Sequence, residues 1–382
     1  MKILHVIPDL KSGGAENFLQ DLLPALRRLG IDSEVISLRG YETIGQHLHA
    51  AGISVAALHA SGYLSMALRL SRLKARVRRY QPDVIHGWLY HGNLAAYFAH
   101  RAWPAARLVW SIRHSLVDPH HERTATRLVI RWGARLSRRA DQIIYNAQAA
   151  ATQHAQVGYA AFKAEVIVNG VDTDKFRPQT EGRSRRRKAY GVGDGDLLIG
   201  MVGRYHSIKG QDVFVRAAKI VAARNTRVRF VMVGRGLDNG NTELIRLISV
   251  SELRDRFVLL GEREDIPRIL ATLDILVSAS WGEGFPNAVA EAMACGVPCV
   301  ATDVGAVREL VADTGRVIRP GSEQTLAAAI LELAGQPDEN RGKLGAAARA
   351  RAVSLYSRER CVSAYADMYR NLAASRTEAT AR

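Results

Sequence analysis

Two carboxylates flank a Gly-Phe-Pro turn in the stretch SASWGEGFPNAVAEAMACGVPC, residues 278–299. Glu283 precedes the turn, and Glu291 follows it inside an apolar helical stretch. A carboxylate withdrawn from water is costly unless something binds it. Because each carboxylate accepts two hydroxyl hydrogen bonds, the pair suits a ligand that carries two polyol groups around a phosphate. For Glu291 alone, a buried salt bridge is the alternative interpretation.

The helix that follows this turn offers an anion site between the two carboxylates. Residues 275–278 are typical of a buried strand, and Pro286 suits the first turn of a helix that continues over residues 287–294. The free N–H groups at such a helix start bind phosphate well. The residues of this turn and helix start are Gly284, Phe285, Pro286 and Asn287.

Two cations follow another predicted strand end, in the loop GRYHSIKG at residues 203–210. Arg204 and Lys209 come after Gly203, and a helix begins after Gly210. Two fixed cations at the end of a parallel strand suit a diphosphate. The alternative is a solvated basic loop.

A third loop, SGGAE, follows the first predicted strand. Gly13 and Gly14 precede a helix that begins at Ala15, and glycines there let the backbone approach an anion closely. The loop lacks the G-x-G-x-x-G pattern, so it gives little support to a dinucleotide site. A flexible turn is the alternative interpretation.

These loops sit in a chain that alternates short apolar strands with helical stretches, such as residues 15–28 and 94–101. The predicted strands are residues 3–7, 33–38, 84–86, 108–112, 142–145, 165–168, 197–202, 229–233, 257–259, 275–278, 298–301 and 316–318. This alternation predicts an α/β protein with two doubly wound Rossmann-like domains. We expect the domains over residues 1–168 and 169–354, followed at 355–382 by a helix and a disordered tail.

Composition favours a soluble protein of more than one domain. The 382 residues are 47% hydrophobic and 24% charged, and the three cysteines are not in C-x-x-C spacing. This cysteine usage indicates a reducing compartment without a disulfide or zinc framework. The start resembles a strand rather than a signal peptide, and no apolar run reaches the ~18–20 residues of a membrane span, so we expect a cytoplasmic protein.

The net charge of +16 indicates an anionic partner. Two predicted helices of the first domain are strongly basic, and they fit an anionic membrane surface or a diphosphate-linked lipid; a solvated helix face is the alternative. Their arginines are Arg69, Arg72, Arg76 and Arg79 in the first helix, beside an apolar face of Met66, Leu70, Leu73 and Val77, and Arg123, Arg127, Arg131, Arg135 and Arg139 in the second. The loop GWLYHGN, with Trp88, Tyr90 and His91, is a candidate acceptor wall or ordinary packing.

The combined motifs resemble the retaining GT-B glycosyltransferases of family four. The resemblance is carried by GEGFPNAVAEAMACGVPCVATDVGAVREL, GRYHSIKG, SGGAE and NGVDTDKFRP, and it covers nearly the whole chain. It implies two domains that face each other across a cleft, with a final helix that crosses back to the first domain. It also implies a hexosyltransferase that uses a UDP- or GDP-sugar and an acceptor that is lipid-linked or a saccharide of the cell envelope.

The resemblance also implies residue roles. Glu283 would hold hydroxyls of the donor sugar, Glu291 would bind the ribose, and Gly14, beside Gly13, would approach the diphosphate from the first domain. Arg204 and Lys209 would hold and stabilise the leaving diphosphate, and the stretch from Gly261 to Arg263 would border the base.

Two positions depart from the family pattern. A histidine usually lies close to the donor sugar, and here VWSIRHS offers both Arg113 and His114, of which we favour His114. The family often has Gly-Gly where this chain has Gly305-Ala306, which puts the details of that loop in question.

No carboxylate is clearly placed as a nucleophile, so the resemblance implies front-face attack assisted by the leaving phosphate. We expect no cofactor and no metal, because the D-x-D runs at 172–174 and 194–196 lie in connecting loops. A 2-epimerase of nucleotide sugars, which shares this fold, and a basic non-catalytic protein that binds anions remain alternatives. No nucleic-acid-binding motif is present in the sequence, and nucleic acid is not an expected partner.

Overall fold

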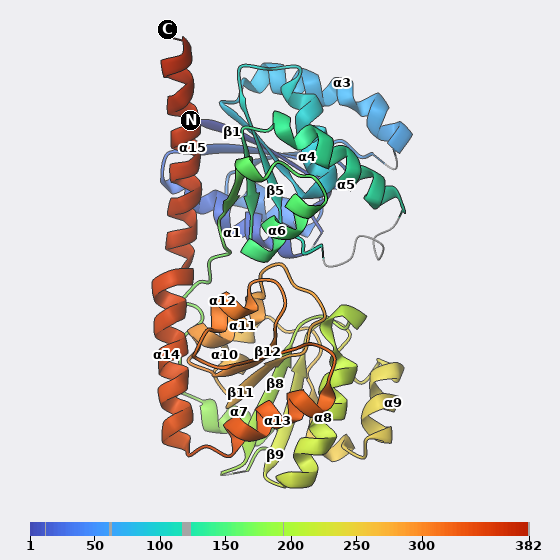
Figure 1. Ribbon diagram of the computed structural model, residues 1–382, viewed down its shortest axis with the longest axis vertical. Helices are drawn as coiled ribbons and strands as arrows, with labels where there is room; N and C mark the ends of the chain where they lie inside the picture. Colours follow the sequence, from blue (N-terminus) through green and yellow to red (C-terminus); the bar gives the residue numbers. More distant parts are fainter. Residues whose placement is uncertain (12, 61–62, 117–123, 194, 381–382) are drawn as a thin grey trace. The chain divides into compact units, whose positions relative to one another are not determined.

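The chain folds into two compact units in a computed structural model that describes residues 1–382 apart from 12, 61–62, 117–123, 194 and 381–382 (Figure 1). Unit 1 comprises Met1–Asn169 and Glu359–Arg382, and unit 2 comprises Gly170–Arg358. The chain therefore leaves unit 1 after Asn169 and returns to it at Glu359. The sequence-based boundaries, 168/169 and 354/355, differ from these by a few residues.

Unit 1 is built on a parallel sheet, which has seven strands among the described residues, in the order β3-β2-β1-β4-β5-β6-β7. The strands are β1 Lys2–Ile7, β2 Asp32–Ser37, β3 Ser54–Ala57, β4 Val84–Trp88, β5 Arg107–Ile112, β6 Gln142–Tyr145 and β7 Ala164–Val166. The helices are α1 Gly14–Arg28, α2 Thr43–Ala50, α3 Tyr63–Tyr80, α4 Leu89–His100, α5 Thr124–Leu136, α6 Gln148–Gln156 and α15 Arg358–Thr380.

Unit 2 repeats the design with a parallel sheet, six-stranded in the part described, in the order β10-β9-β8-β11-β12-β13. Its strands are β8 Leu197–Val202, β9 Val228–Val233, β10 Phe257–Leu259, β11 Ile275–Ser278, β12 Cys299–Thr302 and β13 Arg316–Ile318. Its helices are α7 Arg183–Ala189, α8 Gln211–Arg224, α9 Thr242–Val250, α10 Ile266–Leu270, α11 Asn287–Ala294, α12 Val307–Val311, α13 Glu323–Ala334 and α14 Asp338–Tyr356.

Both sheets reverse their strand order at one point, between β1 and β4 in unit 1 and between β8 and β11 in unit 2. The predicted doubly wound fold is confirmed. In such sheets, ligands bind beyond the carboxyl ends of the strands at this switch point. Ligand-binding residues are therefore expected in the loops after β1, β4, β8 and β11.

Every strand predicted from the sequence is present, whereas β3 was missed. β3 is a short strand at the sheet edge, and its pattern SVAA contains two alanines and no fully buried side chain. The hydrophobic signal that identifies buried strands is therefore weak there.

The carboxyl-terminal segment differs from the predicted helix and tail. Ser357 separates α14 from α15 because it forms a parallel bridge with Val171, whose N–H donates to the Tyr356 carbonyl and whose own carbonyl accepts from Arg358 N–H. The expectation of a disordered tail from Ala374 is wrong as far as Thr380, since α15 continues to that residue. Alanine, arginine and glutamate are good helix formers, and the segment has no glycine or proline.

Helix α15 lies alongside unit 1 (Figure 1) and contributes buried side chains to its core. A buried polar network joins the helix to the sheet. The hydroxyl of Tyr369 lies 2.6 Å from His86 Nδ1, and His86 Nε2 lies 2.8 Å from Ser111 Oγ. Trp88 donates from Nε1 to His5 Nδ1 at 3.1 Å. Burial lowers the pKa of His5 to about 3 and holds the pKa of His86 well below its ordinary value, so both imidazoles are neutral.

Candidate active site

Strands β8 and β11 are hydrogen-bonded neighbours, so the loops after them meet at the unit 2 switch point. The N–H of Trp281, in the loop after β11, donates to the Ile208 carbonyl in the loop after β8 at 2.8 Å. Two loops that are far apart in sequence thus form one surface.

Glycine and a buried glutamine shape the loop after β8. Gly210 has φ 68° at the N-cap of α8, and a Cβ at this position would run into the Ala279 carbonyl, so only glycine fits. Gln211 is 2% exposed and donates from Nε2 to the Arg204 carbonyl at 2.9 Å. These contacts hold Arg204 and Lys209 on one short, closely packed loop.

Lys209 and Glu283 form the centre of the site. Lys209 Nζ lies 2.5 Å from Glu283 Oε1, which also accepts a hydrogen bond from Ser280 Oγ at 2.7 Å. The two side chains are 25% and 14% exposed, so each partner offsets the desolvation of the other. The structure brings these two predicted catalytic residues together; their pairing with each other was not predicted, because they are 74 positions apart in the chain.

The rest of the predicted diphosphate loop is accessible. The methylenes of Lys209 pass over Gly203, with Cδ and Cε 4.0 Å from the place a Cβ would take. The Arg204 side chain is exposed, and within the described part of the chain no ion pair of Arg204 is found. The loop therefore offers a solvent-facing guanidinium beside an ammonium group that is already bound to a carboxylate.

Gly305 supports the turn that carries Glu283. A Cβ on Gly305, at φ 57°, would run into the carbonyls of Glu283 and Gly284, and Ala306 N–H donates to the Gly284 carbonyl at 3.1 Å. Ala306 has φ −89°, which an ordinary residue adopts easily. The steric requirement for glycine thus falls on Gly305, and this chain meets it.

The start of α11 is more closed than the sequence suggests. Pro286 is the N-cap, and the Asn287 N–H donates to the Phe285 carbonyl at 3.0 Å. Phe285 is 6% exposed and packs against Tyr356, with ring centroids 6.0 Å apart. Phe285 therefore anchors the turn instead of facing a ligand through its side chain.

Glu291 lies one turn inside α11 and is half-buried. Its carboxylate faces Cys295, whose pKa rises to about 12 through burial and, secondarily, through the charge of Glu291. The structure places Glu291 on the helix that begins at the Glu283 turn, as predicted. Its role toward a ribose stays a prediction.

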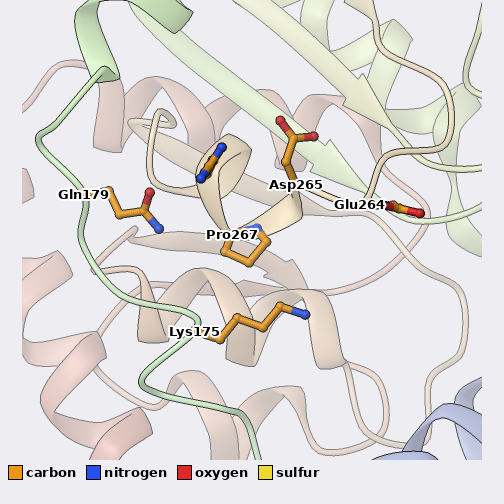
Figure 2. A pocket seen from close by; sticks show the side chains of 6 residues that line it. Lys175, Gln179, Glu264, Asp265 and Pro267 are labelled. Atoms are coloured by element: carbon orange, nitrogen blue, oxygen red, sulfur yellow. The ribbon is translucent and has the colours of Figure 1, made fainter. Parts of the chain in front are cut away.

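Arg263 lies in the link between β10 and α10, where its guanidinium donates to both carboxylate oxygens of Asp265 at 2.8 and 3.0 Å. Figure 2 shows Asp265 and Glu264 pointing in different directions at the start of α10. The hollow beside them, of about 360 Å³, is lined by Lys175, Gln179, Glu264, Asp265, Pro267 and Arg268. Arg263 is thus fixed by a neighbouring carboxylate, which suits a residue that borders a ligand more than one that binds a diphosphate.

The first D-x-D run has a structural role. Asp172 forms an ion pair with Arg358 at 2.7 Å, and its other carboxylate oxygen accepts from the Asp174 and Lys175 N–H groups. Asp194 of the second run lies outside the described residues. The prediction of metal independence therefore rests on the chemistry of the diphosphate loop.

In unit 1, a glutamate that the sequence interpretation missed fills the predicted anion loop. Gly13 is the N-cap of α1, and a Cβ there would run into the carboxylate of Glu16, whereas Gly14 faces open space. Glu16 is 8% exposed and binds the N–H groups of Ala15 and of its own residue. Burial raises its pKa to about 7, although these N–H bonds act in the opposite direction.

Arg113 and His114 separate in the structure. Arg113 donates to Tyr365 OH at 3.1 Å and to Asn169 Oδ1, and its guanidinium stacks 3.7 Å from the centroid of the Phe18 ring. His114 lies beside Tyr90, whose hydroxyl is 2.7 Å from His154 Nε2. Arg113 thus serves to attach α15 and the end of unit 1, and the role of His114 toward a sugar stays a prediction.

The proposed acceptor wall needs a correction at Trp88. Trp88 is fully buried at the end of β4 and belongs to the core, so it is packing. His91, by contrast, is half-buried and lines a cavity together with Tyr90.

The basic helix α3 is also less free than predicted. Leu73 and Val77 are fully buried, which makes that face core, and the side chain of Met66 lies outside the described residues. Arg76 pairs with the buried Glu34, and Arg69 donates to the Leu58 carbonyl. Arg69 and Arg76 therefore already bind groups within unit 1, whereas Arg72 and Arg79 are exposed.

On the second basic helix, α5, an apolar pair accompanies the charges. Leu128 and Trp132 are 52% and 57% exposed, and Arg131 and Arg135 are exposed beside them, at helical spacing. Arg123 lies outside the described residues. Among the described residues, no helix is both long and apolar enough to cross a membrane. The sequence analysis counted the arginines of α5 but missed Trp132.

The fold and the site together define a doubly wound, two-domain α/β protein with a charged ligand site at the switch point of its second sheet. Residues 12–175 match the family described as Glycosyltransferase Family 4, and residues 196–336 match Glycosyl transferases group 1. The chain belongs to these glycosyltransferases, which have the GT-B fold.

Similar proteins include a lipopolysaccharide core biosynthesis mannosyltransferase, LpsB, of Rhizobium meliloti, 35% identical over 51% of this chain and 52% of the relative. An Escherichia coli UDP-Gal:alpha-D-GlcNAc-diphosphoundecaprenol alpha-1,3-galactosyltransferase is 35% identical over 37% of each chain. The chain thus spans about half or less of the length of these relatives. The Anabaena protein HepE, solved in complex with UDP, is 26% identical, with a TM-score of 0.85 over 97% of this chain and 100% of that one.

Proposed function

We propose that the protein transfers a hexose from a UDP-sugar, with retention of configuration, to a lipid-linked acceptor used in cell-envelope glycan synthesis. The observation that carries the proposal is the Lys209–Glu283 pair at the unit 2 switch point, 2.5 Å apart, with Arg204 exposed on the same loop. Lys209 and Arg204 stabilise the leaving diphosphate, and the Glu283 carboxylate accepts hydrogen bonds from the hydroxyls of the sugar.

The choice of donor is supported by HepE, which was solved with UDP and also with UDP-glucose. The choice of acceptor is supported by the Escherichia coli relative, whose name specifies alpha-D-GlcNAc-diphosphoundecaprenol as the acceptor. Glu283 Oε1 already accepts from Ser280 and Lys209, which suits orientation of the sugar more than nucleophilic attack. Retention therefore proceeds by front-face attack, with the leaving phosphate taking the acceptor proton.

Thermal shift with UDP, GDP and their sugars is the first test. UDP at about 100 times its Kd should add about 2.7 kcal/mol to the free energy of unfolding. Release of UDP from the matching UDP-sugar should then require an added lipid-linked saccharide as acceptor. Conversion of the UDP-sugar into its 2-epimer without acceptor, or no response to any nucleotide, would contradict the proposed activity.

Transfer should survive metal chelation. The diphosphate charge is met by Arg204, Lys209 and backbone N–H groups, so a divalent cation has no necessary role. Initial rates measured with excess EDTA should stay within about twofold of untreated enzyme. Loss of activity that magnesium or manganese restores would overturn this prediction.

The protein should attach peripherally to the inner face of the cell membrane through α5. Each exposed basic residue near an anionic surface contributes about 1 kcal/mol, and screening weakens this attraction as ionic strength rises. The exposed Trp132 and Leu128 add an apolar contribution that salt does not remove.

Co-sedimentation with anionic vesicles should therefore fall with salt in wild type without reaching zero. Arg131→Glu with Arg135→Glu should reduce binding at low salt, and Trp132→Ala should remove the salt-resistant part. The matched control is Arg72→Glu with Arg79→Glu on α3. Equal binding of wild type to neutral and anionic vesicles would refute electrostatic attachment.

A further inference from the structure

Unit 1 has a cavity of about 690 Å³ at its own switch point. Pro8 follows β1, and Leu89, Tyr90 and His91 follow β4, the two adjacent strands between which the sheet order reverses. This is the position where doubly wound sheets bind ligands. The volume falls within the range of about 300–1,000 Å³ that is usual for small-molecule sites.

Apolar side chains form the walls of this cavity. They come from three helices and a strand: Leu70 of α3, Leu94, Ala95 and Phe98 of α4, Val129 of α5 and Ile112 of β5. Leu70, Leu94 and Phe98 are only half-buried, so apolar surface remains accessible inside the cavity. Such walls suit a hydrocarbon chain, whereas the polar lining residues can bind a polar headgroup; these are Arg39, Tyr90, His91, Arg113, His114 and Thr126.

Basic residues accompany these walls. Arg39 lines the cavity and is 69% exposed, and Asp9, its carboxylate partner, is 4.0 Å away. His91 and His114 also line the cavity, and the pKa of His91 is lowered by burial and by the charge of Arg39. The charge of Arg39 and a hydrogen bond from the neutral His91 imidazole beside it suit an anionic headgroup.

A strained residue marks the same place. Leu89 has φ 60°, a conformation that leucine rarely adopts, and it lies directly after β4 on the cavity wall. Strained backbone is retained mainly at functional sites, because the surrounding structure must compensate its cost. This supports a ligand-binding role for the cavity independently of its lining.

We propose that the cavity binds the hydrocarbon chain of an anionic lipid phosphate, with the phosphate at Arg39 and His91. The inference rests on the proposed function, in which the acceptor is lipid-linked. It is consistent with α5, which gives Val129 and Thr126 to the cavity and exposes Leu128 and Trp132 on another side. The helix that lines the cavity thus also carries the apolar pair expected to touch the membrane.

Decyl phosphate, below its micellar concentration, is the probe. It should bind wild-type protein at least about a hundredfold more tightly than butyl phosphate, because each buried methylene contributes up to about fourfold. It should also bind about tenfold more tightly than decyl maltoside, and Arg39→Ala should abolish that second preference. Isothermal titration measures all three affinities.

Two threonines of α5 give a matched pair of variants. Thr126→Phe fills the cavity and should weaken decyl phosphate binding at least about tenfold, whereas Thr124→Phe adds the same ring at an exposed position and should not. Leu70→Gln offers a second test with little change in volume, and a melting curve of each variant establishes that it folds. Equal affinity of wild type and Thr126→Phe for decyl phosphate, or equal affinity of wild type for butyl and decyl phosphate, overturns the proposal.

Transfer assays separate this proposal from the function on which it rests. If the transferase proposal fails, no UDP-sugar is consumed with any lipid-linked saccharide, although decyl phosphate still binds in the cavity. If the cavity proposal fails, transfer proceeds at the same rate to short-chain and long-chain acceptors in both threonine variants.

Discussion

Lys209→Ala should lower kcat for sugar transfer by roughly 10²–10³, with a much smaller effect on UDP affinity. A preorganised cation contributes most when negative charge accumulates on the leaving diphosphate, and removal of one such group has a cost of this size. Steady-state rates with the UDP-sugar and acceptor, together with titration of UDP, provide the measurement.

The same substitution leaves Glu283 without its lysine in a site where its side chain is only 14% exposed. A loss of stability could therefore imitate a loss of catalysis. Lys209→Ala combined with Glu283→Gln removes the unpaired charge, so its melting temperature should recover toward wild type while kcat stays low. Recovery of kcat in the double variant would mean that Lys209 serves only to neutralise Glu283.

Lys219→Ala is the control for loss of one positive charge in the same unit, because Lys219 is exposed on α8, outside the loop. It should keep wild-type rates and wild-type UDP affinity. If Lys209→Ala is folded and transfers sugar within about threefold of wild type, the assignment of the diphosphate site is wrong.

Local sequence signals predicted that Lys209 and Glu283 lie at the same edge of the sheet, for a physical reason. Glycines at strand ends, the lysine after β8 and the proline before α11 are local signals, and parallel strands bring their carboxyl ends to one edge. What the sequence could not predict is contact between distant residues. The pairing of Lys209 with Glu283 and the closure of Gly305 on the Glu283 turn both depend on the order β8-β11-β12 in the sheet.

Unit 1 illustrates the opposite case. Charge counting selected the arginines of α3, yet Arg76 pairs with Glu34 and Arg69 with a carbonyl, because periodicity shows which face a residue occupies and not what lies opposite. Trp88 was left open between an acceptor wall and ordinary packing for a related reason: a tryptophan at a strand end looks accessible until α15 covers it. A local sequence pattern does not predict which residues from the far end of the chain pack against a segment.

The burial of three histidines in unit 1 should make the protein acid-sensitive. Burial lowers the pKa of His5 to about 3 and that of His154 to about 4, and His86 lies well below its ordinary value. His5 and Arg113 beside His86, and His114 beside His154, lower these pKa values further, because a second proton nearby would be repelled. In the unfolded chain these side chains take up protons near pH 6.5, whereas in the folded protein they stay neutral.

The unfolded state therefore binds more protons between about pH 6.5 and pH 4, and stability falls as the pH falls through this window. At pH 5 His5 and His154 each contribute a loss of about 2 kcal/mol, and His86 adds a loss in the same direction. Glu16 acts oppositely: its folded pKa of about 7 exceeds the ordinary 4.5, so the folded state binds more protons in that range and gains stability on acidification. The gain between pH 8 and pH 5 is about 2–3 kcal/mol, which is less than the combined loss at the three histidines, so a net loss of stability is expected.

Urea denaturation at pH 8, 6.5 and 5, followed by tryptophan fluorescence, measures this loss, and it reports mainly on unit 1 because Trp88, Trp103, Trp110 and Trp132 all lie there. His154→Gln should reduce the loss on acidification by about 2 kcal/mol, since glutamine takes up no proton. Glu16→Gln should increase the loss by about 2–3 kcal/mol, because it removes the opposing contribution. Exposed His49→Gln is the matched control and should leave the pH dependence of wild type unchanged. A gain of stability on acidification, or the same pH dependence in wild type and His154→Gln, would show that the buried imidazoles take up protons without unfolding the domain.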